Sequence, residues 1–399
     1  MPDTRRELQL RLPEAYRHAA KDLAYAQNPD QMIPGHRMRL LVDGDQTFPD
    51  MLDAIKGARY YVHLETYILM HDTVGELFAG PLCERAGAGV DVRVMYDSVG
   101  SLGLSDAYVD RLRRAGVQVV EFGPINRWRN RRKWSRRDHR KILVVDGRIG
   151  FVGGINIGDD YAPRDIGGKG WRDTHMRIEG PVVGDLETMF RAVWQQQGGA
   201  PYPPRPRDSD ESLAVDDSEF CHVIGSDLRG RRSAPRRHYL HAMRAARDHI
   251  YIANAYFVPD RRIRRALCRA AERGVDVRVI VSLVSDIKLV QYAGEYTYAD
   301  LMKSGVIIHG WDDAHMHSKV AVIDGVWSTV GSYNLDYVSL FYNLEVIAEI
   351  IGRKFGRETD AMFRADFARA APLDVEEWHH RPWWKKALCW LFYRFRRWL

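Results

Sequence analysis

The chain has 399 residues, of which 45% are hydrophobic and 28% are charged. This length suits two ordinary domains, and the composition excludes a wholly disordered chain. A formal net charge of +6 indicates an anionic partner, such as a phosphorylated substrate, lipid headgroups or nucleic acid.

Cysteine usage and hydropathy restrict the cellular setting. The four cysteines are far apart and form no C-x-x-C pair, which argues against a zinc site or a disulfide scaffold and favours a reducing compartment. The N-terminus lacks the apolar segment of a secretory signal, and no apolar run approaches the roughly 18 residues that span a bilayer. We therefore expect any contact with a membrane to be peripheral.

In the first half of the chain, apolar runs alternate with segments of helical periodicity. Strands are predicted at residues 59–68, 89–94 and 117–122, and helices at 72–86 and after the capping residue Ser105. Strand–helix–strand order predicts largely parallel pairing, with helices covering the sheet.

The second half repeats this order. GVDVRV occurs at both 89–94 and 274–279, and the strand at 59–68 resembles residues 249–258. A duplication of this length is the main organising feature of the sequence. We expect an α/β protein made of two similar α/β/α halves that face each other across a pseudo-twofold axis.

Each half carries one copy of the pattern H-x-K-x4-D. The copies comprise His139, Lys141 and Asp146, and His317, Lys319 and Asp324. His and Lys are two residues apart at the start of a strand, so they project from one face. Asp-Gly follows each strand and predicts a hairpin turn. The turn alone can account for the presence of the aspartate in each copy of the motif. Asn156 and Asn334 lie 17 residues after the two histidines.

These residues carry a resemblance to the phospholipase D superfamily, whose signature is a duplicated H-x-K-x4-D. The similarity extends over nearly the whole chain, through segments such as 138–161, 171–181 and 317–339. Within the superfamily the chain looks like the bacterial cardiolipin synthases, and more like a short type without N-terminal transmembrane helices. The resemblance implies two phospholipase D-like halves with the active site at their interface.

The chemistry of a phosphodiester suits this residue set. Two lysines can neutralise the non-bridging oxygens, and imidazoles can serve as nucleophile and as general acid and base. By analogy with the family, His139 is the nucleophile and His317 the acid and base, although the motifs are nearly symmetric. The resemblance also places Asp173 and Glu345 as imidazole partners and the two asparagines as phosphate donors.

No cofactor is expected, and no cluster of Asp, Glu and His is typical of a metal site. His315 precedes His317 by two residues, but no third ligand is apparent beside this pair.

The predicted boundaries divide the chain into four parts. A first half covers 1–197, a Pro- and Gly-rich linker 198–217, and a second half 218–375. The remaining residues, 376–399, form a basic and aromatic tail that we expect to bind membranes.

A helical projection of the tail gathers its apolar residues on one arc, flanked by Lys, Arg and Trp, as in a helix lying among headgroups. The alternative is a helix docked on the protein's own core. The predicted membrane-binding residues are Trp383, Trp384, Leu388, Leu391, Phe392, Phe395 and Trp398. A second basic tract, residues 127–140, could attract anionic lipid or bind nucleic acid.

The resulting hypothesis is a phosphatidyltransferase that makes cardiolipin from phosphatidylglycerol through a phosphohistidine, with phosphatidylglycerol or phosphatidylethanolamine as the donor. We expect it on the cytoplasmic face of the bacterial cell membrane. A phospholipase D hydrolase, a nuclease and a non-catalytic membrane scaffold are the alternatives. Nucleic acid is the less favoured partner because it gives the apolar tail no role, and the sequence leaves the oligomeric state open.

Overall fold

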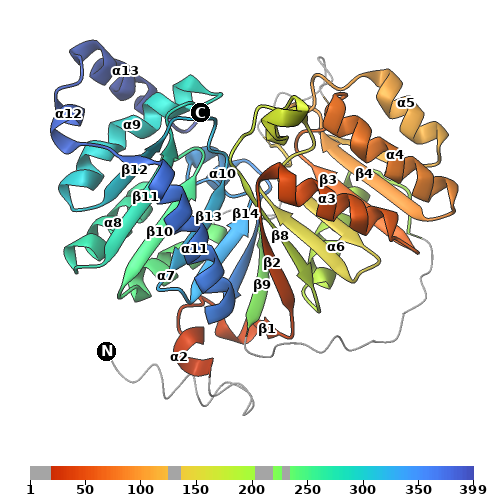
Figure 1. The fold of residues 1–399 in the computed structure, drawn as a ribbon, viewed down its shortest axis with the longest axis horizontal. Coiled ribbons are helices and arrows are strands. Elements are labelled where there is room, and N and C mark those ends of the chain that lie inside the picture. Colours follow the sequence, from red (N-terminus) through yellow and green to blue (C-terminus); the bar gives the residue numbers. More distant parts are fainter. Residues whose placement is uncertain (1–18, 125–135, 203–218, 227–233) are drawn as a thin grey trace.

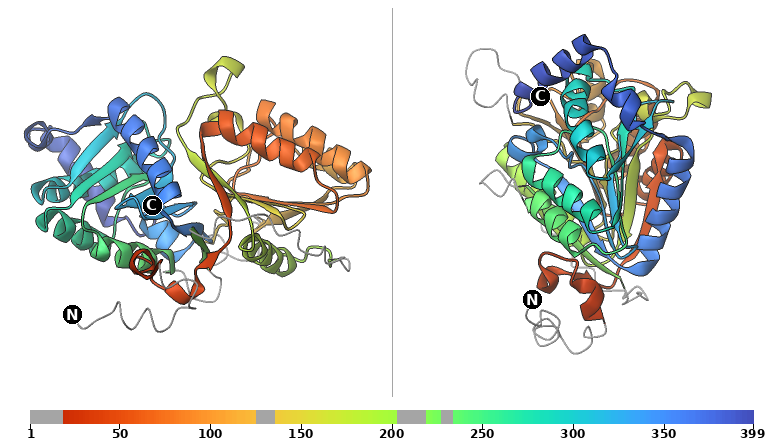
Figure 2. Two further views of the ribbon diagram at one scale, coloured as in Figure 1. Left: turned by 60° about the horizontal axis from the view of Figure 1, so that its bottom comes forward. Right: turned by 90° about the vertical axis from the view of Figure 1, so that its left-hand side faces the viewer.

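The computed structural model describes residues 19–124, 136–202, 219–226 and 234–399. Two sheets lie beside each other, with helices on the outer sides of both (Figures 1 and 2). Residues 203–217 of the expected linker and 127–135 of the basic tract fall outside the described residues.

Each half contains a sheet with the same core order of seven strands. The first sheet runs β2 (Arg37–Val42), β8 (Thr174–Glu179), β7 (Ile149–Gly153), β6 (Ile142–Val145), β3 (Tyr61–Thr66), β4 (Asp91–Asp97) and β5 (Gln118–Phe122). The second sheet runs β1 (Ile33–Pro34), β9 (Phe220–Gly225), β15 (Val346–Ile351), β14 (Trp327–Gly331), β13 (Lys319–Ile323), β10 (His249–Asn254), β11 (Asp276–Ser282), β12 (Ile307–Trp311) and β16 (Ala371–Pro372). The order from β9 to β12 repeats that from β2 to β5, which confirms the duplicated α/β architecture.

Strand polarity corrects one prediction. In the first sheet only β3–β4 and β4–β5 are parallel, whereas the pairs from β2 to β3 are antiparallel. The second sheet follows the same scheme. The expectation of largely parallel sheets was therefore wrong, because the motif hairpin and the strands beside it return along the sheet without a helical crossover.

The strand correspondence between the halves is also shifted from the predicted one. Val62 pairs with Val145 and Ile250 with Ile323, and these partners hold the same place in the two motif strands. The structural counterpart of His249 is therefore Tyr61, whereas the sequence comparison aligned His249 with Arg59. A shift of two residues leaves each side chain on the same face of a strand, so the hydrophobic pattern could not distinguish the two alignments.

Helices cover both faces of each sheet. In the first half these are α3 (Asp43–Lys56), α4 (Thr73–Gly87), α5 (Asp106–Arg114) and α6 (Val183–Gln196). In the second half they are α7 (Ala234–Ala245), α8 (Arg261–Glu272), α9 (Lys288–Lys303), α10 (Tyr337–Phe341) and α11 (Arg353–Arg369). Ser105 caps α5 by accepting from the amide of Tyr108, as the sequence predicted.

The two halves share one buried core. Met176 and Ile178 of β8 pack in the same apolar cluster as Val330 of β14 and Ala348 of β15. Helix α6 contacts β9 of the second half, and α11 contacts β2 of the first. A buried ion pair, with Arg172 Nη2 at 2.7 Å from Asp366 Oδ2, joins the halves at one side of this core.

The N-terminal segment differs from the predicted domain boundary. Helix α2 (Ala20–Leu23) packs in the core of the second half, and β1 pairs with β9. The hydroxyl of Tyr25 donates to Asp324 at 2.6 Å. Residues 19–34 therefore belong to the second half, although they precede the first half in sequence.

Two helices follow the second half, α12 (Val375–His379) and α13 (Trp383–Arg394). Helix α13 packs on α9, where Phe392 stacks on Tyr292 and Cys389 is buried (Figure 1). The alternative of a docked helix is therefore correct for one side of the tail, and membrane contact stays a prediction for the other. An aromatic and apolar set remains exposed: Trp383, Trp384, Trp390, Leu391, Phe395 and Trp398. Among the described residues, no helix is long and apolar enough to cross a membrane.

Candidate active site

Two short backbone bridges join the motif segments across the halves. The amide of His139 donates to the carbonyl of Leu344 at 3.0 Å, in a parallel bridge between Asp138 and Leu344. The amide of His317 likewise donates to the carbonyl of Arg172 at 2.7 Å, in a bridge between Arg172 and Met316. Each bridge places a motif histidine beside the residue that precedes a carboxylate of the other half.

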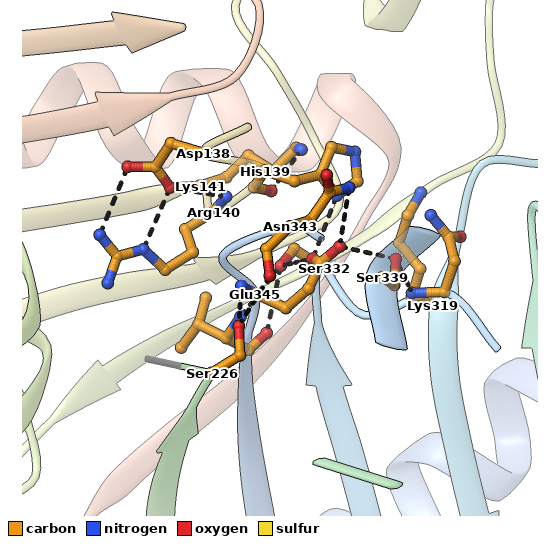
Figure 3. A network of polar contacts seen from close by, with 12 residues as sticks. Asp138, His139, Arg140, Lys141, Ser226, Lys319, Ser332, Ser339, Asn343 and Glu345 are labelled. Carbon is orange, nitrogen blue, oxygen red and sulfur yellow. Dashed lines mark hydrogen bonds and ion pairs between the residues drawn. The ribbon is translucent and has the colours of Figure 1, made fainter. Parts of the chain in front are cut away.

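The two histidines are consequently paired across the interface. His139 Nδ1 lies 3.1 Å from Glu345 Oε2, and His317 Nδ1 lies 2.7 Å from Asp173 Oδ2 (Figure 3 shows the first pair). All four side chains are buried. Because Nδ1 of each ring is engaged by a carboxylate, Nε2 is the nitrogen left for substrate. The predicted imidazole partners therefore lie in hydrogen-bonding position, each on the histidine of the opposite half.

Glu345 is held by a dense set of donors. Its carboxylate accepts from Ser332 Oγ at 2.5 Å and from Ser339 Oγ at 2.6 Å, in addition to His139 (Figure 3). Burial raises the pKa of Glu345, but His139 and these hydroxyls outweigh burial and hold the pKa below its usual value. At Asp173, burial prevails over the nearby Lys319 cation and raises the pKa. The carboxylate beside His139 is therefore the more strongly ionised of the two.

A Gly–Ser difference accompanies the two carboxylates. Gly154 corresponds to Ser332, and a Cβ at Gly154 would lie 2.2 Å from Asp173 Oδ1. In the first half the carboxylate occupies the space that the serine fills in the second. Ser332 thus orients Glu345.

Two buried lysines complete the centre. Lys141 Nζ donates to the carbonyl of His139 at 2.7 Å, and Lys319 Nζ donates to that of His317. Burial, reinforced by the neighbouring Lys319, lowers the pKa of Lys141 to about 7. Burial lowers the pKa of Lys319 to about 8, against the opposing influence of Asp173 and Glu345.

Burial and the nearby lysines also lower the pKa of both histidines, that of His317 further than that of His139. Four basic groups therefore share one buried region, and an anion placed among them would relieve their mutual repulsion.

The motif aspartates lie outside this group. Asp146 Oδ1 and Oδ2 accept from the backbone amides of residues 59–61, each at 2.8 Å. Asp324 does the same for residues 247–249 and also accepts from Tyr25. Both aspartates have φ 53° and begin the Asp-Gly turn. They fix the start of β3 and β10 at the far end of the motif strand, and a direct part in the reaction stays a prediction.

The two asparagines have different surroundings. Asn156 accepts from the amide of Ile68 at 3.0 Å and donates through Nδ2 to Tyr161 Oη at 2.6 Å. Asn334 is buried, and its Oδ1 has no hydrogen-bond partner among the described residues. The described contacts thus assign Asn156 a positioning role, and a contact with phosphate remains a prediction for both.

Aromatic residues around the imidazoles were not predicted. Tyr67 packs edge-on against His139 with ring centroids 5.0 Å apart, and Tyr161 packs against His317 at 5.4 Å. Trp171 lies 5.7 Å from His317. Tyr161 and Ser339 each follow the motif asparagine by five residues, so comparing the two repeats beyond the motif could have identified both.

Other predicted site residues have local roles. His315 donates toward the carbonyl of Val284 at 3.1 Å and lies 3.2 Å from Asp286, and the described residues supply no third ligand for a metal beside His317. Of the basic tract, the described Arg137 and Arg140 are buried. Arg140 pairs with Glu65 at 2.6 Å and with Asp138 at 3.1 Å, so it braces the segment that carries His139.

Duplicated sheets with paired His–carboxylate dyads and two buried lysines define an enzyme of the phospholipase D superfamily. Residues 51–194 and 239–367 match the family model described as "Cardiolipin synthase, PLD-like domain". The chain is 34% identical to a cardiolipin synthase from Geobacillus thermodenitrificans over 373 residues, which cover 93% of this chain and 74% of that protein. It is 35% identical to cardiolipin synthase A from Pseudomonas fluorescens, covering 86% of this chain and 71% of that one.

Among solved structures, the phosphatidylserine synthase of Haemophilus influenzae has the same fold. The TM-score is 0.71 at 14% sequence identity, and the match covers 96% of this chain and 98% of the other. With both the family model and the relatives in agreement, the chain belongs to the cardiolipin synthase family of phospholipase D-like enzymes.

Proposed function

We propose that the enzyme transfers a phosphatidyl group from one phospholipid to a hydroxyl of phosphatidylglycerol, and so forms cardiolipin. The observation that carries this proposal is the convergence of two crossed His–carboxylate dyads with two buried lysines. Family membership supports a phospholipid substrate, since the relatives are cardiolipin synthases.

In the first step, His139 Nε2 attacks phosphorus and the bond to the headgroup oxygen breaks. Lys141 and Lys319 neutralise the non-bridging oxygens. The bound phosphodiester anion raises the pKa of His317, which takes up a proton and gives it from Nε2 to the leaving alkoxide. The phosphohistidine ring carries positive charge, which an ionised partner of Nδ1 stabilises. Glu345 has the lowered pKa of the two carboxylates, and this supports His139 as the nucleophile.

In the second step, neutral His317 Nε2 takes the proton of the incoming glycerol hydroxyl, and that oxygen attacks phosphorus. The bond to His139 Nε2 breaks, which regenerates the enzyme and leaves His317 protonated for the next cycle. Water in place of the alcohol would give phosphatidic acid, so transfer requires a dry site. The few per cent exposure of His139 and His317 agrees with that requirement.

The exposed aromatic residues of α13 support a peripheral position on the membrane. Trp383 and Trp398 expose 80% and 79% of their surface, and Lys and Arg flank them in the sequence. Large apolar side chains beside cations suit the boundary between acyl chains and anionic headgroups. We place this face on the cytoplasmic leaflet, where anionic phospholipid is available.

The test is incubation with labelled phosphatidylglycerol in vesicles, followed by identification of the products by mass spectrometry. Cardiolipin is expected. Phosphatidic acid alone would establish a hydrolase, and no lipid product would refute lipid turnover.

In His317→Asn, a labelled phosphatidyl ester of p-nitrophenol, whose leaving group needs no proton, should still transfer its phosphatidyl group to His139, where the label accumulates because no base activates the incoming alcohol. His71→Gln, at an exposed histidine, is the matched control and should turn over normally. Label recovered on another residue would overturn the assignment of the nucleophile.

A further inference from the structure

Three potential metal ligands meet in the second half, away from the residues of the proposed reaction. His222 lies on β9, His238 on α7 and Glu349 on β15. One ligand atom from each side chain lies within 4.8 Å of the others. This cluster is the only one of its kind among the described residues.

The sheet register brings the first two ligands together. Glu349 is the direct cross-strand partner of His222, so their side chains project from the same face. His238 reaches this pair from α7, and its Nδ1 lies 2.9 Å from Glu349 Oε2. His238 and Glu349 are both buried.

His222 is not explained by a hydrogen bond. Its Nδ1 lies 3.8 Å from the same Glu349 oxygen, which is too long for a hydrogen bond. This nitrogen is buried and has no hydrogen-bond partner among the described residues. The buried nitrogen of His222 and the oxygen of Glu349 thus face each other across 3.8 Å, a separation at which both atoms can bind the same cation.

The spacing fits a tetrahedral cation. Bonds of about 2.0–2.1 Å at tetrahedral angles put neighbouring ligand atoms about 3.3 Å apart. The observed 2.9 Å and 3.8 Å lie on either side of this value. Small side-chain adjustments would bring both nitrogens and the oxygen to coordination distance.

The surroundings of the cluster resemble the outer shell of a metal site. Trp327 Nε1 donates to Glu349 Oε1 at 2.8 Å, which orients the carboxylate and leaves Oε2 toward the histidines.

We propose that His222, His238 and Glu349 bind one divalent cation of the zinc class. Two imidazoles and one carboxylate are ligands that Zn²⁺ accepts, and a water would complete the coordination. These ligands are far apart along the chain and belong to no spaced motif, so a metal site was not predicted from the sequence.

The cation would brace the strands that position the catalytic carboxylate. Glu345 lies four residues before Glu349, or about 13 Å along an extended strand. Its backbone is held to the end of β9 by Ser226, whose Oγ accepts from the amide of Glu345 at 2.7 Å. Strands β9 and β15 therefore carry the cation cluster toward one end and the contact between Ser226 and Glu345 at the other end.

The test is titration of the chelator-treated, full-length protein with Co²⁺ and then Zn²⁺, in the absence of lipid. One Co²⁺ per chain is expected, with the intense visible absorption of a tetrahedral site, and Zn²⁺ should displace it and raise the melting temperature. His238→Gln and Glu349→Gln should weaken binding by roughly 100-fold or more, since each removes a ligand. His222→Gln, at the most exposed ligand, provides a variant in which folding is least affected.

His241→Gln is the matched control, because His241 lies on the same helix and bonds instead to the carbonyl of Ala24. It should bind as the wild type does. Binding absent from the wild type, or unchanged in His222→Gln and His238→Gln, would overturn the proposal. Absorption lost in His315→Gln but kept in His238→Gln would place the ion in the active site and also overturn it.

Discussion

The lowered pKa values of the buried lysines predict that an anion binding between them takes up protons. With a pKa of about 7, Lys141 is roughly nine-tenths neutral at pH 8, and Lys319 with a pKa of about 8 is about half neutral. If a phosphodiester restores both charges, the two lysines gain about 1.4 protons at this pH, and protonation of a histidine would add to this value. The empty site holds fewer protons than the occupied one, so the affinity falls as the pH rises through 7 and 8.

Calorimetry measures this uptake directly. Dimethyl phosphate remains a monoanion over the relevant pH range, so titrations in two buffers of different ionisation enthalpy report protons taken up by the protein alone. In Lys141→Met, one lysine is removed and Lys319 no longer faces a second cation, so the uptake due to the lysines should fall from about 1.4 to below about half a proton. Uptake near zero in the wild type at pH 8, with dimethyl phosphate bound, would refute the reasoning.

Three further predictions concern separate parts of the molecule. Glu345→Gln removes the charge-assisted hydrogen bond to His139, which is worth about 1.5–3 kcal/mol, so single-turnover rates should fall roughly 10- to 150-fold. A loss below threefold would contradict the role of Glu345. Asp146→Asn should lower the free energy of unfolding in urea by about 1–3 kcal/mol with little change in kcat, and loss of turnover in the folded variant would return Asp146 to the chemistry. Trp383→Ala combined with Trp398→Ala removes two exposed side chains, each of which contributes about 1.5–3 kcal/mol when it is buried in a membrane. Flotation should then show at least 100-fold weaker binding to phosphatidylglycerol vesicles, and undiminished binding would exclude this face as the membrane contact.

The sequence predicted the duplicated architecture and the His and Lys of both motifs because these features are encoded locally, whereas Asp173 and Glu345 were inferred from the family resemblance. Spacing of two places His139 and Lys141 together, and Asp-Gly specifies the hairpin. Which carboxylate faces which histidine could not be predicted, since that depends on how the halves pack. Spacing along the chain gives no information on the bridge between Asp138 and Leu344.

Other differences have equally specific causes. A period-two pattern is unchanged by a shift of two residues, so the correspondence between β3 and β10 was misaligned. The helical projection of the tail identified an apolar arc but could not show that α9 covers Phe392 and leaves Trp398 exposed. Residues 19–34 pack on the second half through contacts formed across most of the chain, such as that from Tyr25 to Asp324.

The exchange of carboxylates between the halves also governs when the enzyme becomes reactive. A nascent chain that has emerged only as far as the linker contains His139 but not Glu345, and His317 has yet to be synthesised. The first half leaving the ribosome therefore has no oriented imidazole and no proton donor. Each dyad therefore forms only after both halves have been synthesised and have packed together.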